Sequence, residues 1–257
     1  MMKLTLCSLI AMPLLCLLAV TVSAQDVPLP PAADLDFQID YYFTELDKNI
    51  TDLAASKNFA ADSSVLARDG NALILVALAA GMSKEDGKYK AAAPEIIKAA
   101  QKVADAKDIA AATAAVAEVK TAATKKSSEK LDWSKHAKME PTMKLAVPRI
   151  NTSMTRYIRT DATLKRGVPN VAGGIAALAA ISQGLTPNFD ETTKPEEKDQ
   201  WTKFSEDFHN AAMKASVAIN GYKAGSVTFD DFKTVLTEMK ENCEHCHEVF
   251  ASGVKVE

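Results

Sequence analysis

The sequence has little cysteine, few aromatic residues and almost no excess of charge of one sign. Gly and Pro number 10 each among 257 residues, a share too low for a collagen-like or disordered chain. Aromatic residues make up 6%, runs of β-branched residues are scarce and Ala is abundant, so the composition favours helix over sheet. The net charge of −3 offers no excess positive charge for phosphate groups, and nucleic acid is therefore not an expected partner.

An export signal is predicted at residues 1–24. Lys3 is its single charge, the run from Leu4 to Val22 is nearly all apolar, and a small-residue site ends at Ala24. Cleavage there predicts a periplasmic or secreted protein. The alternatives are an uncleaved membrane anchor, for which the run is short, and a lipoprotein anchored through Cys16, past which the run continues. Elsewhere no segment is predicted to span a membrane, since the apolar run Leu73 to Ala80 is too short.

Apolar residues recur at helical spacing along the rest of the chain and predict two sets of four helices. The expected helices lie near 34–53, 62–80, 87–106 and 108–124, and then near 137–159, 168–183, 195–220 and 228–251. Asp34 is the expected N-cap of the first helix. Because the connections are short, the predicted fold is all-α, with two tandem antiparallel four-helix bundles over residues 25–130 and 131–257.

Short matches between the two sets indicate an internal duplication. Residues 77–80 match residues 177–180 at an offset of 100, and residues 119–121 resemble residues 232–234 at an offset of 113. The growing offset implies one insertion, which the polar stretch 186–199 could hold. Ala-rich helices also match by chance, so the shared order of the helices carries more weight than any one match.

Only two cysteines remain once the signal is removed, too few for a disulfide framework in a chain of this size. They lie in Cys243-Glu244-His245-Cys246-His247, the Cys-x-x-Cys-His spacing of a c-type haem attachment site. Two thiols three positions apart share one face of a helix, and each can bond one vinyl group of haem. The adjacent imidazole then points at the iron.

The motif lies on the apolar stripe of the expected last helix, which Thr228 and Asp231 would start as a variant of the capping box. A four-helix unit with this motif near its C-terminus, followed by an aromatic residue three positions on (Phe250), resembles the cytochrome c′ and cytochrome c556 family. The resemblance covers about residues 137–251.

The resemblance implies one covalent haem c, attached through Cys243 and Cys246, with His247 as the proximal iron ligand. The first half resembles the same fold without the haem site. An offset of 113 places three other residues at the motif positions there: Lys130, Trp133 and Ser134. Bundles of this family often pair through their first two helices, so the resemblance implies such a pair within one chain or a homodimer.

In this family the first helix of the bundle supplies the opposite face of the haem. Met143 is the expected distal iron ligand, Met139 is the second choice, and Leu145 is the alternative that would leave the iron five-coordinate. A Met at helical spacing is equally typical of core packing. Pro141 and Pro148 disturb this helix and make its register uncertain.

The surroundings of the haem depart from the family pattern in one respect. Ala251 and Ser252 follow Phe250, where the family usually has a basic residue, so a partner for a haem propionate must come from elsewhere. Arg149 is the candidate, with ordinary surface solvation as the alternative. Gly173-Gly174 inside a helix indicates the close approach of a flat group or of another helix. Three aromatic residues are expected near the haem or in the core: Trp201, Phe204 and Phe208.

Three other interpretations of the motif compete. A zinc site would combine the motif with His136 or His209, both of which are expected at the surface. A dithiol oxidoreductase would place its cysteines at a helix N-terminus rather than near the end of the last helix. A helical binding module without a cofactor explains the first half but not the motif.

Within the haem interpretation two functions remain. An iron with His and Met ligands suits electron transfer with a redox partner protein. A five-coordinate iron in an apolar pocket suits the binding of a diatomic gas such as nitric oxide or carbon monoxide. Electron transfer is the preferred prediction because Met occupies the expected stretch. No set of nucleophile, base and orienting residue is recognisable, so substrate turnover is not expected.

Overall fold

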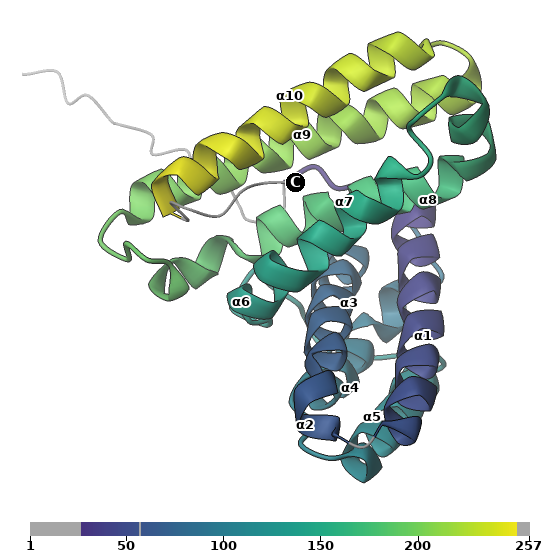
Figure 1. Ribbon diagram of the computed structural model, residues 1–257, viewed down its shortest axis with the longest axis vertical. Helices are drawn as coiled ribbons and strands as arrows, with labels where there is room; N and C mark the ends of the chain where they lie inside the picture. The colour runs from purple at the N-terminus through teal and green to yellow at the C-terminus, as the bar shows by residue number, and fades with distance from the viewer. Residues whose placement is uncertain (1–26, 57, 251–257) are drawn as a thin grey trace, which may run out of the picture.

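A computed structural model describes residues 27–56 and 58–250 (Figure 1). The expected signal at residues 1–24 lies outside the described residues. All regular secondary structure in the described part is helical, which confirms the predicted all-α class.

The N-terminal half consists of four longer helices that pack around one another. Helix α1 packs against α3 and α5, and α4 packs against the same two helices, so each helix has two neighbours and the ring is closed. Leu, Ile, Val and Ala side chains fill the space between them. The bounds are α1 (Ala32–Ala55), α2 (Phe59–Asp62), α3 (Ser64–Met82), η2 (Lys90–Ala92), α4 (Ala93–Ala104) and α5 (Ile109–Ala122).

The C-terminal half is more open. Helix α7 packs against α8, α8 against α9, and α9 against α10, while α10 makes no comparable contact with α7. Figure 1 shows α9 and α10 as a long antiparallel pair above α7. The bounds are α6 (Met139–Pro141), η3 (Thr142–Ala146), α7 (Val147–Thr155), α8 (Asp161–Gly184), η4 (Thr186–Glu191), α9 (Lys198–Ala224) and α10 (Phe229–Phe250).

Helix starts follow the local capping chemistry, with one correction. Asp34 is not the N-cap of α1, because the helix begins at Ala32 after Pro31 and Asp34 lies in the first turn. A proline before the first residue stops the chain from continuing the helix backwards. Helix α8 begins earlier than predicted because Thr160 and Thr163 form a reciprocal capping box. In α10 the Asp231 N–H donates to Thr228 Oγ1 at 3.2 Å, as predicted.

The first helix of the C-terminal half is broken, as its two prolines suggested. Pro141 ends α6, the next five residues (η3) adopt a π-helical geometry, and Pro148 stands in the first turn of α7. Pro lacks an N–H and cannot complete the i→i−4 ladder, so a wider turn is a way to pass it. The widened turn sets which side chains of this segment face α8 and α9.

The stretch Phe59–Met82 corrects the expectation that no further segment is apolar enough to span a membrane. By length and composition it would suffice, with a mean hydropathy of 1.5 over its most apolar window. In the structure 72% of that window is buried, against α1, α4 and α8. The apolar surface of α3 is therefore used as the core of the molecule.

Helix α8 joins the two halves. It packs against α1 and α3 of the N-terminal half, and α3 also packs against η3. The junction is formed by α1 and α3 of the N-terminal half and by η3 and α8 of the C-terminal half. These are the first helical segments of each half, through which the family resemblance implied that two bundles pair. A Cβ atom on Gly173 would lie 2.8 Å from the ring of Phe37, and one on Gly174 would lie 2.8 Å from the Met154 side chain. The glycine pair thus permits close helix contact, the plainer of the two predicted roles.

The carboxylate of Glu191 holds the start of the C-terminal half, at Met139, in place. Glu191 accepts hydrogen bonds from the backbone N–H of Met139 and from the amide of Asn188, both at 2.9 Å, and its ion pair with Lys135 measures 2.6 Å. Burial alone would raise the pKa of Glu191, but these partners outweigh it and hold the pKa below its usual value. The charged form of Glu191 is therefore the one that stabilises the fold.

Replacing Glu191 with Gln should lower the free energy of unfolding near pH 7 by about 1–3 kcal/mol, because the amide has one acceptor oxygen instead of two and no charge to pair with Lys135. A carboxyl whose pKa is lowered on folding contributes above the pKa of the unfolded chain, about 4.3, and stops contributing as the pH falls through its folded value. The difference between the two proteins in urea denaturation should therefore shrink below about pH 4.

Glu140→Gln, at an exposed ion pair with Lys144, is the control and should change stability by less than about 1 kcal/mol. A pH-independent loss in Glu191→Gln would contradict the assignment.

Candidate functional site

The wide space between α7 and α10 contains a largely apolar cleft. Its empty volume is about 580 Å3, part of it open to solvent. The walls come from η3, α7, α8, α9 and α10. The lining residues are Met143, Val147, Asn151, Ile181, Ser182, Leu185, Trp201, Phe204, Ser205, Phe208, Asn242, Cys243, Cys246 and His247.

Among the described residues of the N-terminal half, no open space between the first and the last helix corresponds to the one between α7 and α10. There the last helix, α5, packs directly against the first, α1, and it ends at Ala122. Helix α10 instead continues to Phe250 and carries the Cys-x-x-Cys-His motif in its final turns. The positions that correspond to the motif, including Trp133, lie beyond α5 in non-helical chain. The two halves therefore differ both in the residues at these positions and in the backbone that holds them.

All three reactive side chains of the motif reach the cleft. Cys243, Cys246 and His247 are half-buried and line the same wall, because spacings of three and four residues share one helical face. Both thiols are free. Burial, with a smaller effect from neighbouring Cys246 and Glu244, raises the pKa of Cys243 to about 12, and burial raises that of Cys246 to about 11. The cleft thus keeps both sulfurs in the uncharged thiol form near neutral pH.

His247 has an unsatisfied ring nitrogen. Its Nδ1 is buried and has no hydrogen-bond partner among the described residues. Burial also lowers the pKa of His247, which favours the neutral imidazole with a free lone pair, the form that ligates metals. A buried polar atom without a partner costs free energy that a bound group can recover. Two thiols, one neutral imidazole and an apolar cleft are the donor set and the surroundings that a covalently attached haem requires.

Aromatic side chains form the wall next to the motif. The three expected residues of α9, Trp201, Phe204 and Phe208, all line the cleft. Phe250 packs edge-on against Trp201 and Phe204, with ring centroids 5.5 and 6.1 Å apart. The Trp201 indole donates to Thr186 O at 3.0 Å, which fixes the ring on η4. These rings give the cleft a rigid apolar floor.

The wall of the cleft that η3 and α7 form shows which of the three candidate distal iron ligands reaches the motif. Met143, in the π-helical stretch η3, lines the cleft together with the motif. Met139 and Leu145 do not line it, and Leu145 is 38% exposed. Among the three residues named from the sequence, the structure brings only Met143 to the motif.

Two predicted residues lie elsewhere. Arg149 forms an ion pair with Glu45 of α1 and lines a different cavity, so it is not a lining residue of the cleft, and its side chain is 36% exposed. His209 is buried, which corrects the expectation of a surface position. Its Nε2 lies 2.8 Å from Pro28 O, and its Nδ1 lies 3.0 Å from Ala179 O.

His136 is half-buried and stays near its own turn, where its ring contacts Ser134 and the carbonyl oxygen of Asp132. Neither His136 nor His209 lines the cleft. Within residues 27–56 and 58–250, no group of three or more His, Cys, Asp or Glu side chains is placed to hold a metal ion.

Several lining residues were not identified from the sequence. Ile181 of α8 and Leu185, which caps this helix, are four residues apart, as are Met143 and Val147, so the helical period could have indicated both pairs. The polar members Asn151, Ser182, Ser205 and Asn242 have no signal of their own, because the packing angles of the helices decide which polar residues border the cleft.

No family model, curated protein or solved structure matches this chain significantly. The functional interpretation therefore depends on the motif and on the cleft that receives it.

The position of His209 leads to a stability prediction. His209→Ala removes the contacts that tie the segment around Pro28 to α8 and α9, and should lower the free energy of unfolding by about 1–3 kcal/mol. Limited proteolysis near residues 27–31 should become faster in the same variant. The matched control is His136→Ala, at a half-buried position in a turn, where the loss should be smaller. Equal losses in both variants would contradict a buried tethering role for His209.

Proposed function

We propose that this chain is an exported monohaem c-type cytochrome that transfers electrons. The observation that carries the proposal is the convergence of Cys243, Cys246, His247 and Met143 on one apolar cleft between α7 and α10. These residues come from segments about 100 positions apart, and the helical period of neither segment requires them to meet. The export signal predicted at residues 1–24 assigns the protein to the periplasm or the extracellular space.

Each side chain of the cleft has a distinct role in this proposal. The thiols of Cys243 and Cys246 would form the thioether links, each by net addition of its S–H across one vinyl group of haem. His247 would ligate the iron with its neutral imidazole, held in place by the flanking tethers. Trp201, Phe204 and Phe208 exclude water from the space beside it. When bound, haem supplies a one-electron redox couple.

Met143 would be a second protein ligand of the iron. An iron held by both a thioether and an imidazole would change oxidation state with little rearrangement, which suits electron transfer. The π-helical turn of η3 supports this role, because wide turns of this kind are frequent at functional sites. Gas binding at a five-coordinate iron is the alternative, and it requires that Met143 only packs in the wall.

The N-terminal half would be a haem-free copy of the same unit, so that the chain forms two tandem four-helix bundles. The direct α1–α5 packing supports this, since the space that a haem would need is closed there. The junction of α1 and α3 with α8 supports a scaffold role for this half. The proposal implies a redox partner protein.

Covalent attachment of haem is the first test. After expression with a cytochrome c maturation system, the wild-type band should stain for haem peroxidase activity on a denaturing gel. Cys243→Ser or Cys246→Ser should lose most of the stain, because each removes one thioether link. His245→Ala is the matched control, since this residue of the motif is exposed and should not affect attachment. An unstained wild-type band would end the proposal.

Ligation by Met143 is the second test. The reduced wild-type protein should bind carbon monoxide slowly and weakly, because the gas must displace the Met. Met143→Ala should open the site and raise the binding rate at least about tenfold, equivalent to about 1.4 kcal/mol in the barrier. Met139→Ala, a Met that does not line the cleft, is the control and should behave like the wild type. Rapid carbon monoxide binding by the wild-type protein would instead support the gas-binding alternative.

A further inference from the structure

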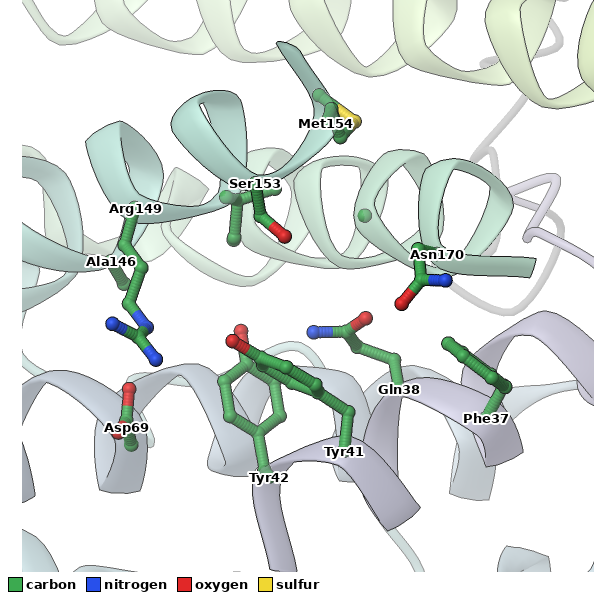
Figure 2. A pocket seen from close by; sticks show the side chains of 12 residues that line it. Phe37, Gln38, Tyr41, Tyr42, Asp69, Ala146, Arg149, Ser153, Met154 and Asn170 are labelled. Carbon is green, nitrogen blue, oxygen red and sulfur yellow. The ribbon is translucent and has the colours of Figure 1, made fainter. Parts of the chain in front are cut away.

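The cleft of the Cys-x-x-Cys-His motif is lined by uncharged side chains. Within residues 27–56 and 58–250, no Lys, Arg, Asp or Glu side chain borders it, and burial lowers the pKa of His247 and favours its neutral form. Arg149, the cation expected there, lines a separate cavity at the junction of the two halves, where it pairs with Glu45 and where Figure 2 shows it above Asp69. The lining of the cleft can therefore offer a negative group only uncharged donors.

Two of the four polar side chains that line the cleft already donate within their own helices. The Ser182 hydroxyl has a single proton and donates it to Ala179 O at 2.8 Å. The Asn242 amide donates to Glu238 O at 2.9 Å, which holds its nitrogen against α10. The other two polar lining residues are Asn151 of α7 and Ser205 of α9.

Asn151 and Ser205 have uncommitted donors. Among the described residues neither side chain has a hydrogen-bond partner, although Ser205 is only 8% exposed and Asn151 is half-buried. A hydroxyl that is more than nine-tenths buried and unpaired costs free energy, which a bound acceptor can recover. The cleft therefore presents two free donors, one from each of two walls.

Asn151 stands at the end of the stripe that faces the motif. Met143, Val147 and Asn151 follow one another at intervals of four residues, and all three line the cleft. Eight residues of helix rise by about 12 Å, so Asn151 lies well away from Met143 along the cleft. For an iron held by Met143 and His247, Asn151 would border the rim of the ring, where haem carries its two carboxylates.

We infer that Asn151 and Ser205 donate hydrogen bonds to the propionate carboxylates of the haem, an inference that rests on the proposed function. These two neutral donors take the place of the basic residue that is missing after Phe250. Hydrogen bonds to an ionised acceptor are stronger than those between neutral groups. A propionate charge near the iron favours the oxidised state, which carries one more positive charge. Donors that draw this charge away from the iron therefore raise the reduction potential.

The test uses the mature holoprotein, prepared with a cytochrome c maturation system and shown by the haem stain to be loaded. Asn151→Leu and Ser205→Ala each remove one donor. Each should lower the reduction potential in a spectroelectrochemical titration at pH 8, where a propionate is ionised, and the double variant should lower it further. The propionate-bending band of the resonance Raman spectrum should move to lower frequency in the same variants, because the carboxylate loses hydrogen bonds.

Ser182→Ala is the matched control, since it removes a hydroxyl that borders the same cleft but whose proton is already used within α8. Its potential and Raman band should stay at the wild-type values. Ser205→Thr keeps the hydroxyl and should also resemble the wild type.

The inference is overturned if loaded Asn151→Leu and Ser205→Ala keep the wild-type potential and band, as propionates in open solvent would give, or if Ser182→Ala shifts both equally. In these cases the wild-type protein still stains for haem, and the proposed function stands. An unstained wild-type protein would overturn the proposed function together with this inference.

Discussion

The close packing of α8 is the contact on which the rest of the structure depends. From Val171 to Ile181 every residue of this helix is buried, and it lies against helices of both halves. Gly173 and Gly174 stand where a Cβ atom would collide with α1 on one side and α7 on the other. Because protein interiors are close-packed, these missing side chains set how near the neighbouring helices come. The cavity at the junction and one wall of the motif cleft are both built on this helix.

The cleft exists because α10 is held mainly by α9. In the N-terminal half the last helix packs against the first and closes the ring. In the C-terminal half the space between α10 and α7 stays open, and the aromatic side chains of α9 and the half-buried face of α10 are apolar surface that borders it. Apolar surface of this kind is normally covered by a ligand or a partner. A flat apolar group tethered to α10 would cover it and would give α10 a second neighbour. In the haem proposal, attachment therefore completes the packing of this half as well as supplying the redox group.

The motif site was the most predictable part of the molecule. Cys243, Cys246 and His247 follow one another within a single helix, so their common face follows from the helical period alone. Met143 came from the family resemblance, and the structure places it at the cleft within the π-helical turn between Pro141 and Pro148. The failures concern long-range partners. Arg149 was expected near haem and pairs with Glu45, and His209 was expected in solvent and lies between α8 and the segment at Pro28.

The sequence by itself determined that the chain is helical, where most helices begin and end, and that two thiols and an imidazole share one face of the last helix. Those properties depend on contacts within a few residues, which composition and spacing record. Only the tertiary structure decided that α5 closes its ring while α10 does not, and that Arg149 pairs with Glu45 across the junction. Such pairings join residues as much as 181 positions apart, as for His209 and Pro28, and they depend on the angles and distances at which whole helices pack.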